Sequence, residues 1–144
     1  MIDMQNNPAT YVRLQSDNEL PAISDAQPFK AIVVIEDEVS QIWQWEVSRW
    51  LALSGCRYIM AWGPECAAWA ESVEEAHLEA FNYDDIPQER SLMATSHEDE
   101  ELSEVFWYAK HRAHHPAHEL RNAVILHISK EDKRIDLLGM YEHA

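Results

Sequence analysis

The chain has few of the residues on which several common functions depend. It has 144 residues but only three glycines, Gly55, Gly63 and Gly139. A loop that cradles nucleotide phosphates needs glycines close together, so this spacing argues against such a loop. Basic residues are also scarce, with 11 Lys and Arg against 26 Asp and Glu and a formal net charge of −15. This charge repels nucleic acids and anionic membranes and favours basic proteins or bound cations as partners.

Cysteines and long apolar segments are few as well. The two cysteines, Cys56 and Cys66, flank a predicted strand and would lie on the order of 20 Å apart, beyond the reach of a disulfide. No apolar run approaches the ~20 residues that span a bilayer. The first residues also lack the basic and then apolar pattern of a signal peptide. We therefore expect a cytoplasmic protein with free thiols and no membrane partner.

Four short apolar runs recur along the chain, at residues 29–35, 56–61, 91–95 and 123–128, with helix-like segments between them. This alternation predicts βαβ units. The run at 31–35 lacks polar alternation, which is typical of a strand covered on both faces. We predict an α/β three-layer sandwich with a mostly parallel four-stranded sheet in the flavodoxin-like order 2-1-3-4. Residues 1–28, rich in Asn, Ser, Asp and Pro, are expected to form an N-terminal arm, and residues 29–144 a single domain.

In that strand order, the polar residues that follow the first and third strands would meet in one crevice. The residues expected to line it are Glu36, Asp37, Trp62, Ser96, His97, Glu98 and Asp99. Carboxylates with a histidine can hold Mg²⁺ or Mn²⁺ or orient a water molecule. Alternatively, these acidic residues cap a helix or lie in a solvated turn. We expect no cofactor, with a divalent cation as the alternative.

Two residues near this edge are candidates for covalent catalysis. Cys66 lies at the start of a predicted helix, where the helix dipole favours a thiolate. A nucleophile needs a base, and His97 is the histidine predicted on the same edge of the sheet. The alternative is that Cys66 is a buried packing residue.

Histidines gather near the end of the third predicted helix, at His111, His114, His115 and His118. His111 and His115 have the i, i+4 spacing of zinc-binding helices, although Pro116 interrupts the helix before His118. The helix dipole also favours histidines in a last turn, so the cluster alone does not establish a metal site.

Two tryptophans lie away from the apolar faces of their predicted helices. At 100° per residue, Trp45 is rotated by about 160° and Trp107 by about 140° from the core stripe. Tryptophan is enriched at protein interfaces, so these side chains are candidates for a partner surface. The alternative is that the N-terminal arm or a loop covers them.

The segment at 33–38 (Val-Val-Ile-Glu-Asp-Glu), followed by a helix and by the Gly55-x-x-Tyr58 strand entry, resembles the first half of a response-regulator receiver domain over residues 29–80. That resemblance implies an acidic pair that holds magnesium beside a phosphorylated aspartate. The predicted third strand carries no terminal aspartate in this sequence.

A longer resemblance, over nearly the whole chain after the arm, is to an uncharacterised family of small bacterial α/β domains. The segments that carry it are 28–30, 61–63 with Cys66 and Trp69, 96–100 and 104–110. This family implies no activity. Charge and tryptophans favour a non-enzymatic, acidic domain that binds or regulates a protein, such as an immunity-type inhibitor, or that self-associates. The alternative is a metal- or nucleotide-dependent enzyme, or a degenerate receiver-like module, using the crevice.

Overall fold

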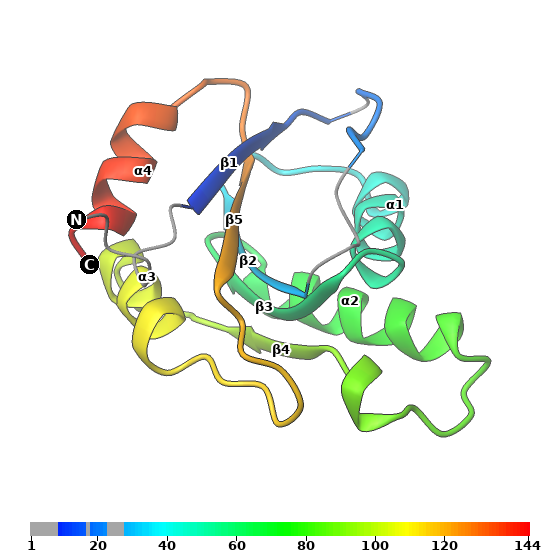
Figure 1. Cartoon of the computed structure of the whole chain (residues 1–144). Helices are drawn as coiled ribbons and strands as arrows, with labels where there is room; N and C mark the ends of the chain where they lie inside the picture. Colours follow the sequence, from blue (N-terminus) through cyan, green and yellow to red (C-terminus); the bar gives the residue numbers. More distant parts are fainter. Residues whose placement is uncertain (1–8, 17, 23–27) are drawn as a thin grey trace.

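A computed structural model describes residues 9–16, 18–22 and 28–144, and within them the chain forms a parallel sheet between two layers of helices (Figure 1). The sheet has five strands in the order β1-β5-β2-β3-β4, and every neighbouring pair is parallel. The strands are β1 (Ala9–Leu14), β2 (Phe29–Ile35), β3 (Cys56–Trp62), β4 (Met93–Ser96) and β5 (Asn122–Ile128).

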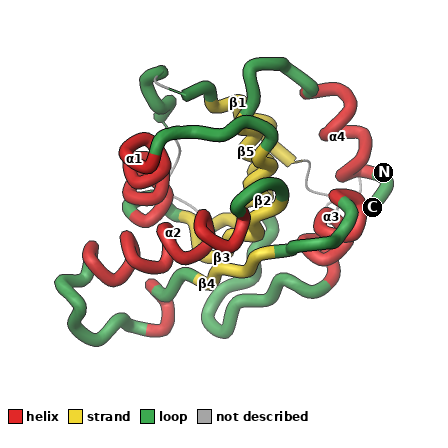
Figure 2. Tube along the Cα trace, turned by 180° about the vertical axis from the view of Figure 1, so that it is seen from behind, coloured by secondary structure: helices red, strands yellow, loops and turns green. Residues whose placement is uncertain are grey.

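Helices cover both faces of this sheet. They are α1 (Gln41–Ala52), α2 (Cys66–Ala80), α3 (Leu102–His111) and α4 (Arg134–Glu142), with a short 3-10 helix at Gln88–Arg90. Helices α1 and α2 pack together on one face, and α3 and α4 lie on the other, as the two opposite views show (Figures 1 and 2). The predicted three-layer α/β architecture is therefore confirmed.

The core consists of two apolar layers separated by the sheet. Every residue of β2 is buried, because this strand lies inside the sheet with a helical layer on each side. Its side chains alternate between the layers: Val33 packs with α1 and α2, whereas Ile32 and Val34 pack with α3 and α4. This explains why the segment is apolar throughout, as the sequence indicated.

The predicted strand number and order were wrong. The fifth strand is β1, which comes from the segment we assigned to an N-terminal arm and pairs with β5 over its whole length. Without β1, the four predicted strands lie in the order 4-1-2-3 and not 2-1-3-4. The chain runs from β2 outward to β3 and β4 and then returns through α3 to place β5 on the other side of β2. The point at which the strand order reverses therefore lies between β2 and β5.

A glycine fixes the start of the turn between β3 and α2. Gly63 has φ +113°, and a Cβ there would lie 2.1 Å from the Ile35 carbonyl oxygen. No L side chain fits this approach, so Gly63 lets the loop after β3 cross directly over the end of β2. The two loops thereby become parts of one closely packed edge, which we call the carboxyl edge of the sheet.

Candidate functional site

One open pocket lies at the carboxyl edge, between the ends of β3 and β4 and the start of α2. Its volume is about 580 Å³, and we call it the carboxyl-edge pocket. It is lined by Trp62, Gly63, Glu65, Cys66, Ala67, Ala68, His97, Glu98, Asp99 and Glu100. The Trp62 indole N–H donates to the Glu100 carbonyl oxygen over 2.7 Å, which ties the end of β3 to the loop after β4.

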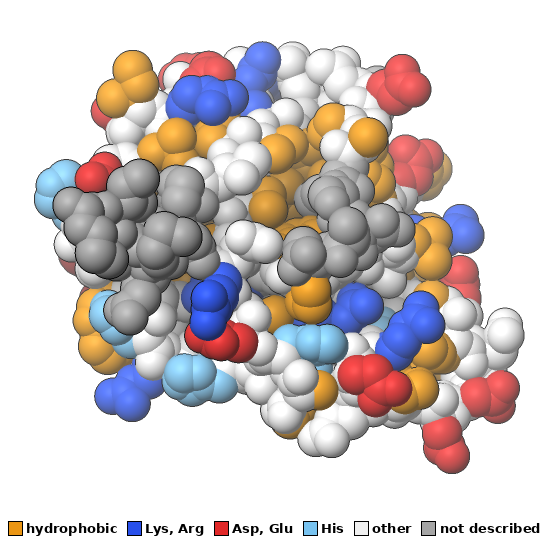
Figure 3. All heavy atoms as spheres, viewed as in Figure 1, with side chains coloured by type: hydrophobic (Ala, Val, Ile, Leu, Met, Phe, Trp, Pro, Cys, Tyr) orange, Lys and Arg blue, Asp and Glu red, His pale blue; other side chains and the backbone are white. Residues whose placement is uncertain are grey.

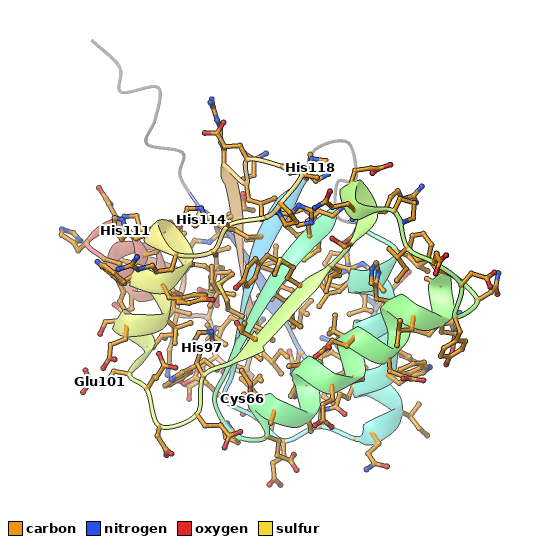
Figure 4. The ribbon with its side chains drawn as sticks, turned by 90° about the horizontal axis from the view of Figure 1, so that it is seen from below. Cys66, His97, Glu101, His111, His114 and His118 are labelled. Atoms are coloured by element: carbon orange, nitrogen blue, oxygen red, sulfur yellow. The ribbon has the colours of Figure 1, made fainter. Side chains whose placement is uncertain are left out.

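Cys66 is the first residue of α2, as the sequence predicted, but only 2% of it is exposed. Its side chain belongs to the apolar layer under α1 and α2, beside Trp69. Figure 4 shows that Cys66 and His97 come from neighbouring elements at the same end of the sheet. Burial limits the access of a substrate to this thiol.

His97 is also buried, and its two ring nitrogens have partners in strand β4 and in the loop after it. Nδ1 lies 3.0 Å from the Glu100 carboxylate and therefore donates to it. In the neutral ring, Nε2 then accepts from the Thr95 hydroxyl over 2.8 Å. The ring also makes an edge contact with Tyr108, with centroids 4.9 Å apart. These contacts hold the imidazole in the loop and occupy the nitrogen that a general base would need.

The acidic residues after β2 do not share this pocket. The prediction that Glu36 and Asp37 face residues 96–99 depended on neighbouring first and third strands, but β3 separates β2 from β4. Ser96 is the exposed last residue of β4 and does not line the pocket. The predicted crevice is therefore divided: Trp62, His97, Glu98 and Asp99 lie at the ends of β3 and β4, whereas Glu36 lies at the reversal point between β2 and β5.

Glu36 belongs instead to a chain of hydrogen bonds at the reversal point, which we call the buried polar chain. The Tyr11 hydroxyl lies 2.6 Å from Nδ1 of His127, and Nε2 of His127 contacts a carboxylate oxygen of Glu36. The other carboxylate oxygen accepts from the Lys133 amine over 2.9 Å. His127 is completely buried, so the chain leads from the sheet interior to the surface.

Chemistry fixes the direction of two contacts in this chain. The carboxylate of Glu36 can only accept, so His127 donates to it from Nε2. The Tyr11 hydroxyl accepts from the Lys133 backbone N–H over 3.1 Å and forms a second hydrogen bond with Nδ1 of His127. Burial raises the pKa of Glu36, but hydrogen bonds from Lys133 and His127 outweigh burial and hold that pKa below its usual value. Burial also raises the pKa of Tyr11.

Sequence reasoning missed Tyr11, His127 and Lys133. One signal was present, because His127 is the only strongly polar side chain in the apolar run at 123–128. A histidine inside such a strand requires partners, since an unpaired buried polar group is costly. Its partner Tyr11 lies 116 residues away, and only the pairing of β1 with β5 brings the two together.

The histidines after α3 are held by separate contacts. His115 donates from Nε2 to the Ser91 carbonyl oxygen and accepts at Nδ1 from the Ala117 backbone N–H. Nε2 of His118 donates to the Glu89 carbonyl oxygen over 2.6 Å. Within residues 9–16, 18–22 and 28–144, no group of three or more His, Cys, Asp or Glu side chains is arranged to hold a metal ion.

The two candidate tryptophans lie on opposite faces of the sheet, because Trp45 is in α1 and Trp107 is in α3. Trp45 is half-buried, whereas 45% of Trp107 is exposed. His111 stacks against the Trp107 ring at 5.0 Å, and the Arg112 guanidinium lies 5.4 Å from its centroid. Trp45 and Trp107 therefore cannot form one continuous surface, and Trp107 is the more accessible of the two.

Comparison with known proteins gives a family. A family model described as "Domain of unknown function (DUF7684)" matches residues 9–144. The chain belongs to the DUF7684 family. The match begins at Ala9, the first residue of β1, so the DUF7684 domain includes the edge strand as well as the four strands predicted. The expected membership of an uncharacterised family is confirmed.

No curated protein and no solved structure matches this DUF7684 chain. None of the helices in the described part of the chain has the length and apolar character needed to cross a membrane.

Proposed function

We propose that this chain is an acidic, non-enzymatic domain that binds a basic protein through the exposed face of α3. The observation that carries the proposal is Trp107, whose indole is 45% exposed on a chain with a net charge of −15. An exposed tryptophan supplies an apolar anchor, and the net charge supplies long-range attraction to a basic partner. In this proposal, the chain regulates or inhibits its basic partner, as an immunity-type inhibitor does.

Acidic residues adjoin this anchor. Glu104 is exposed on α3, one turn before Trp107. The loop that leads into α3 carries four further exposed acidic residues, which are Glu98, Asp99, Glu100 and Glu101. A basic segment lying along α3 would therefore meet carboxylates first and the indole one turn later. This order combines charge steering with a buried aromatic contact.

The reactive side chains at the carboxyl edge support a non-enzymatic role. Cys66 is buried, and both nitrogens of His97 are hydrogen-bonded, one to Thr95 in β4 and the other to Glu100 in the loop after β4. His127 and Tyr11 likewise satisfy each other and their neighbours. A catalytic base needs a free position for the proton that it accepts, whereas groups that only hold a fold are fully paired.

The proposal also concerns the cellular compartment of the chain, and it excludes nucleic acids and anionic membranes as partners. Nucleic acids and anionic membranes are unfavourable because their charge has the same sign as the chain. A reducing, cytoplasmic and bacterial setting fits the two free cysteines, Cys56 and Cys66, and the family resemblance. Receiver-like phosphotransfer is not part of the proposal, because β4 ends in Ser96 and carries no aspartate.

Site-specific photo-cross-linking tests the proposal. A photoreactive phenylalanine analogue replaces Trp107 in one variant and Tyr83 in a control, since Tyr83 is 61% exposed in the loop after α2. We expect the probe at position 107 to capture a basic protein in cells, in a yield that falls as salt rises, and the probe at 83 to capture none. The same cross-linked products from both positions would contradict the proposal. So would capture of an acidic protein, or of copies of this chain alone.

The carboxyl-edge pocket favours one alternative, a metal- or nucleotide-dependent enzyme that uses Cys66 and His97. Its volume of about 580 Å³ would hold a small molecule. The rate at which a reagent alkylates the Cys66 thiol in the native chain tests this alternative. A rate that a divalent cation or a nucleotide lowers would favour the enzyme. If neither the cation nor the nucleotide slows alkylation of Cys66, the result would favour the protein-binding domain.

A further inference from the structure

A second cavity, of about 440 Å³, lies at the opposite end of the sheet, and we call it the amino-edge cavity. It is lined by Lys30, Lys110, Ala113, His114, His115, His118, Glu119, Leu120, Arg121 and Tyr141. Figure 4 shows His114 and His118 along the loop that follows α3, at the end of the molecule farthest from Cys66 and His97. On the face drawn in Figure 3, histidine side chains are visible on the lower part of the molecule and at its left edge.

Lys30 places a cation in the wall of this cavity. It is the second residue of β2 and points toward α3, and only 7% of it is exposed. Its amine donates to the Ala109 carbonyl oxygen over 2.5 Å. An ammonium group has three N–H donors, so one carbonyl leaves donors for another acceptor. Because burial removes the solvation of this charge, a second acceptor would be strongly favourable.

Lys110 adds a second ammonium group from α3. Its amine donates to the carbonyl oxygens of Tyr141, Glu142 and Ala144 at 2.9, 3.1 and 3.4 Å, which uses its three N–H donors and fastens the end of the chain after α4. Burial and the nearby Lys110 charge lower the pKa of Lys30. Among the described residues, no aspartate or glutamate side chain lies within 4 Å of either amine. In the described part of the chain, the cavity thus holds two like charges without an acidic counter-ion.

The remaining charged groups do not supply that counter-ion. Glu119 is the only acidic residue of the lining, and its carboxylate pairs with Arg121 over 3.0 Å. His115 is held by Ser91 and Ala117, as described above. His118 uses Nε2 for the Glu89 carbonyl, which leaves Nδ1. In a chain with a net charge of −15, the lining therefore carries an excess of positive charge.

We propose that the amino-edge cavity binds the phosphate group of a small molecule, with Lys30 as the main ligand and Lys110 as a second cation. A phosphate carries up to two negative charges and several acceptor oxygens, which match the positive charge of the two ammonium groups and the unused donors of Lys30. The volume of about 440 Å³ admits either inorganic phosphate or a small phosphate monoester. This site is separate from the α3 surface and does not depend on the protein-binding proposal.

Calorimetric titration with inorganic phosphate at constant ionic strength tests the site. We expect one phosphate per chain, and we expect Lys30→Met to weaken binding by at least about tenfold, because it removes a charged hydrogen-bond donor. Lys130→Met is the matched control, since Lys130 is exposed beyond β5 at the other end of the sheet. Circular dichroism establishes that each variant is folded. No binding, or equal weakening in both variants, would overturn the proposal.

A measurement on the unmodified chain removes any dependence on the folding of Lys30→Met. Nuclear magnetic resonance of the lysine side chains follows the titration of Lys30 with and without phosphate. A bound anion stabilises the ammonium form, so phosphate should raise the pKa of Lys30 and leave Lys130 unchanged. An unchanged titration of Lys30 at saturating phosphate would overturn the site.

A parallel titration with ribose 5-phosphate distinguishes the two sources of the phosphate group. Tighter binding than inorganic phosphate, lost in Lys30→Met, assigns the cavity to a phosphorylated compound. Tighter binding of inorganic phosphate assigns it to the free ion. Binding of ribose 5-phosphate that persists in Lys30→Met would contradict the role of Lys30.

Discussion

The Tyr11 hydroxyl is hydrogen-bonded to Nδ1 of His127 over 2.6 Å and joins the edge strand β1 to its neighbour β5 through side chains as well as backbone. The same hydroxyl accepts a hydrogen bond from the backbone N–H of Lys133, one residue before α4. One oxygen atom therefore fastens an edge strand, an inner strand and the start of a helix.

Removing the Tyr11 hydroxyl should destabilise the fold. Tyr11→Phe leaves Nδ1 of His127 and the Lys133 N–H without their partner, and we expect a loss of about 1–3 kcal/mol in the free energy of unfolding. Urea denaturation measures this loss. Tyr83→Phe is the control, because Tyr83 is exposed and donates only to Glu75, and it should change stability by less than about 0.5 kcal/mol. Equal effects of the two changes would contradict the buried polar chain.

The Glu36 carboxylate should stabilise the fold in a pH-dependent way. Its pKa in the fold lies below the ordinary value of 4.5, so its contribution is present above that value and is lost as pH falls through the folded pKa. The melting temperature of Glu36→Gln should therefore be lower than that of the unmodified chain at neutral pH and converge with it in acid. A difference that stays constant down to about pH 2.5 would contradict this pairing.

The same experiment has a control on the neighbouring turn. Glu38 is exposed, and no ion pair joins it to another described residue. Glu38→Gln should follow the melting curve of the unmodified chain at every pH.

Gly63 and Gly139 should respond in opposite ways to alanine. Gly63→Ala puts a methyl group against the Ile35 carbonyl at a positive φ and should cost at least about 2 kcal/mol. Gly139→Ala fills open space inside α4 and should stabilise the fold by about 0.5–1 kcal/mol. Thermal denaturation of both variants measures the contrast, and a stable Gly63→Ala protein would refute the close approach of the two loops.

Both thiols should be protected in the folded chain. Burial raises the pKa of Cys56 to about 12, and Cys66 is only 2% exposed. A thiol reagent at pH 8 should therefore modify the native chain slowly and both cysteines rapidly in urea. Fast reaction of one native thiol, mapped to Cys66 by mass spectrometry, would point back to an accessible nucleophile at the carboxyl-edge pocket.

Local pattern was sufficient to predict strands β2 to β5, but not strand β1 or the order of the strands in the sheet. The continuous apolar run of β2 indicates that the strand is buried on both faces. The spacing of Trp43, Val47 and Leu51 places these side chains on the buried face of α1. Strand β1 escaped prediction because an edge strand is half-exposed, and Thr10 and Arg13 interrupt its apolar side chains. Its place depends on pairing with β5, more than a hundred residues later, which no local pattern records.

The candidate site was predictable to the same extent. Cys66 and His97 line one pocket because each follows a strand end, and strand ends can be recognised in sequence. Glu36 could be recognised as a polar residue at a strand end, but its partner His127 could not be predicted, since strand order decides which loops meet.

The role of Lys30 could not be predicted for another reason. A lysine in an apolar strand suggests a surface position, whereas here it lies beneath α3 at the base of a cavity.

The position of β1 also affects the order in which the fold can form. Translation produces β1 before the other strands of the described sheet, but its partner in that sheet, β5, leaves the ribosome after β2, β3 and β4. Strand β1 must therefore wait for β5 while β2, β3 and β4 assemble, and it docks when His127 and Lys133 become available to Tyr11. Closing so long a loop makes this pairing a late step of folding.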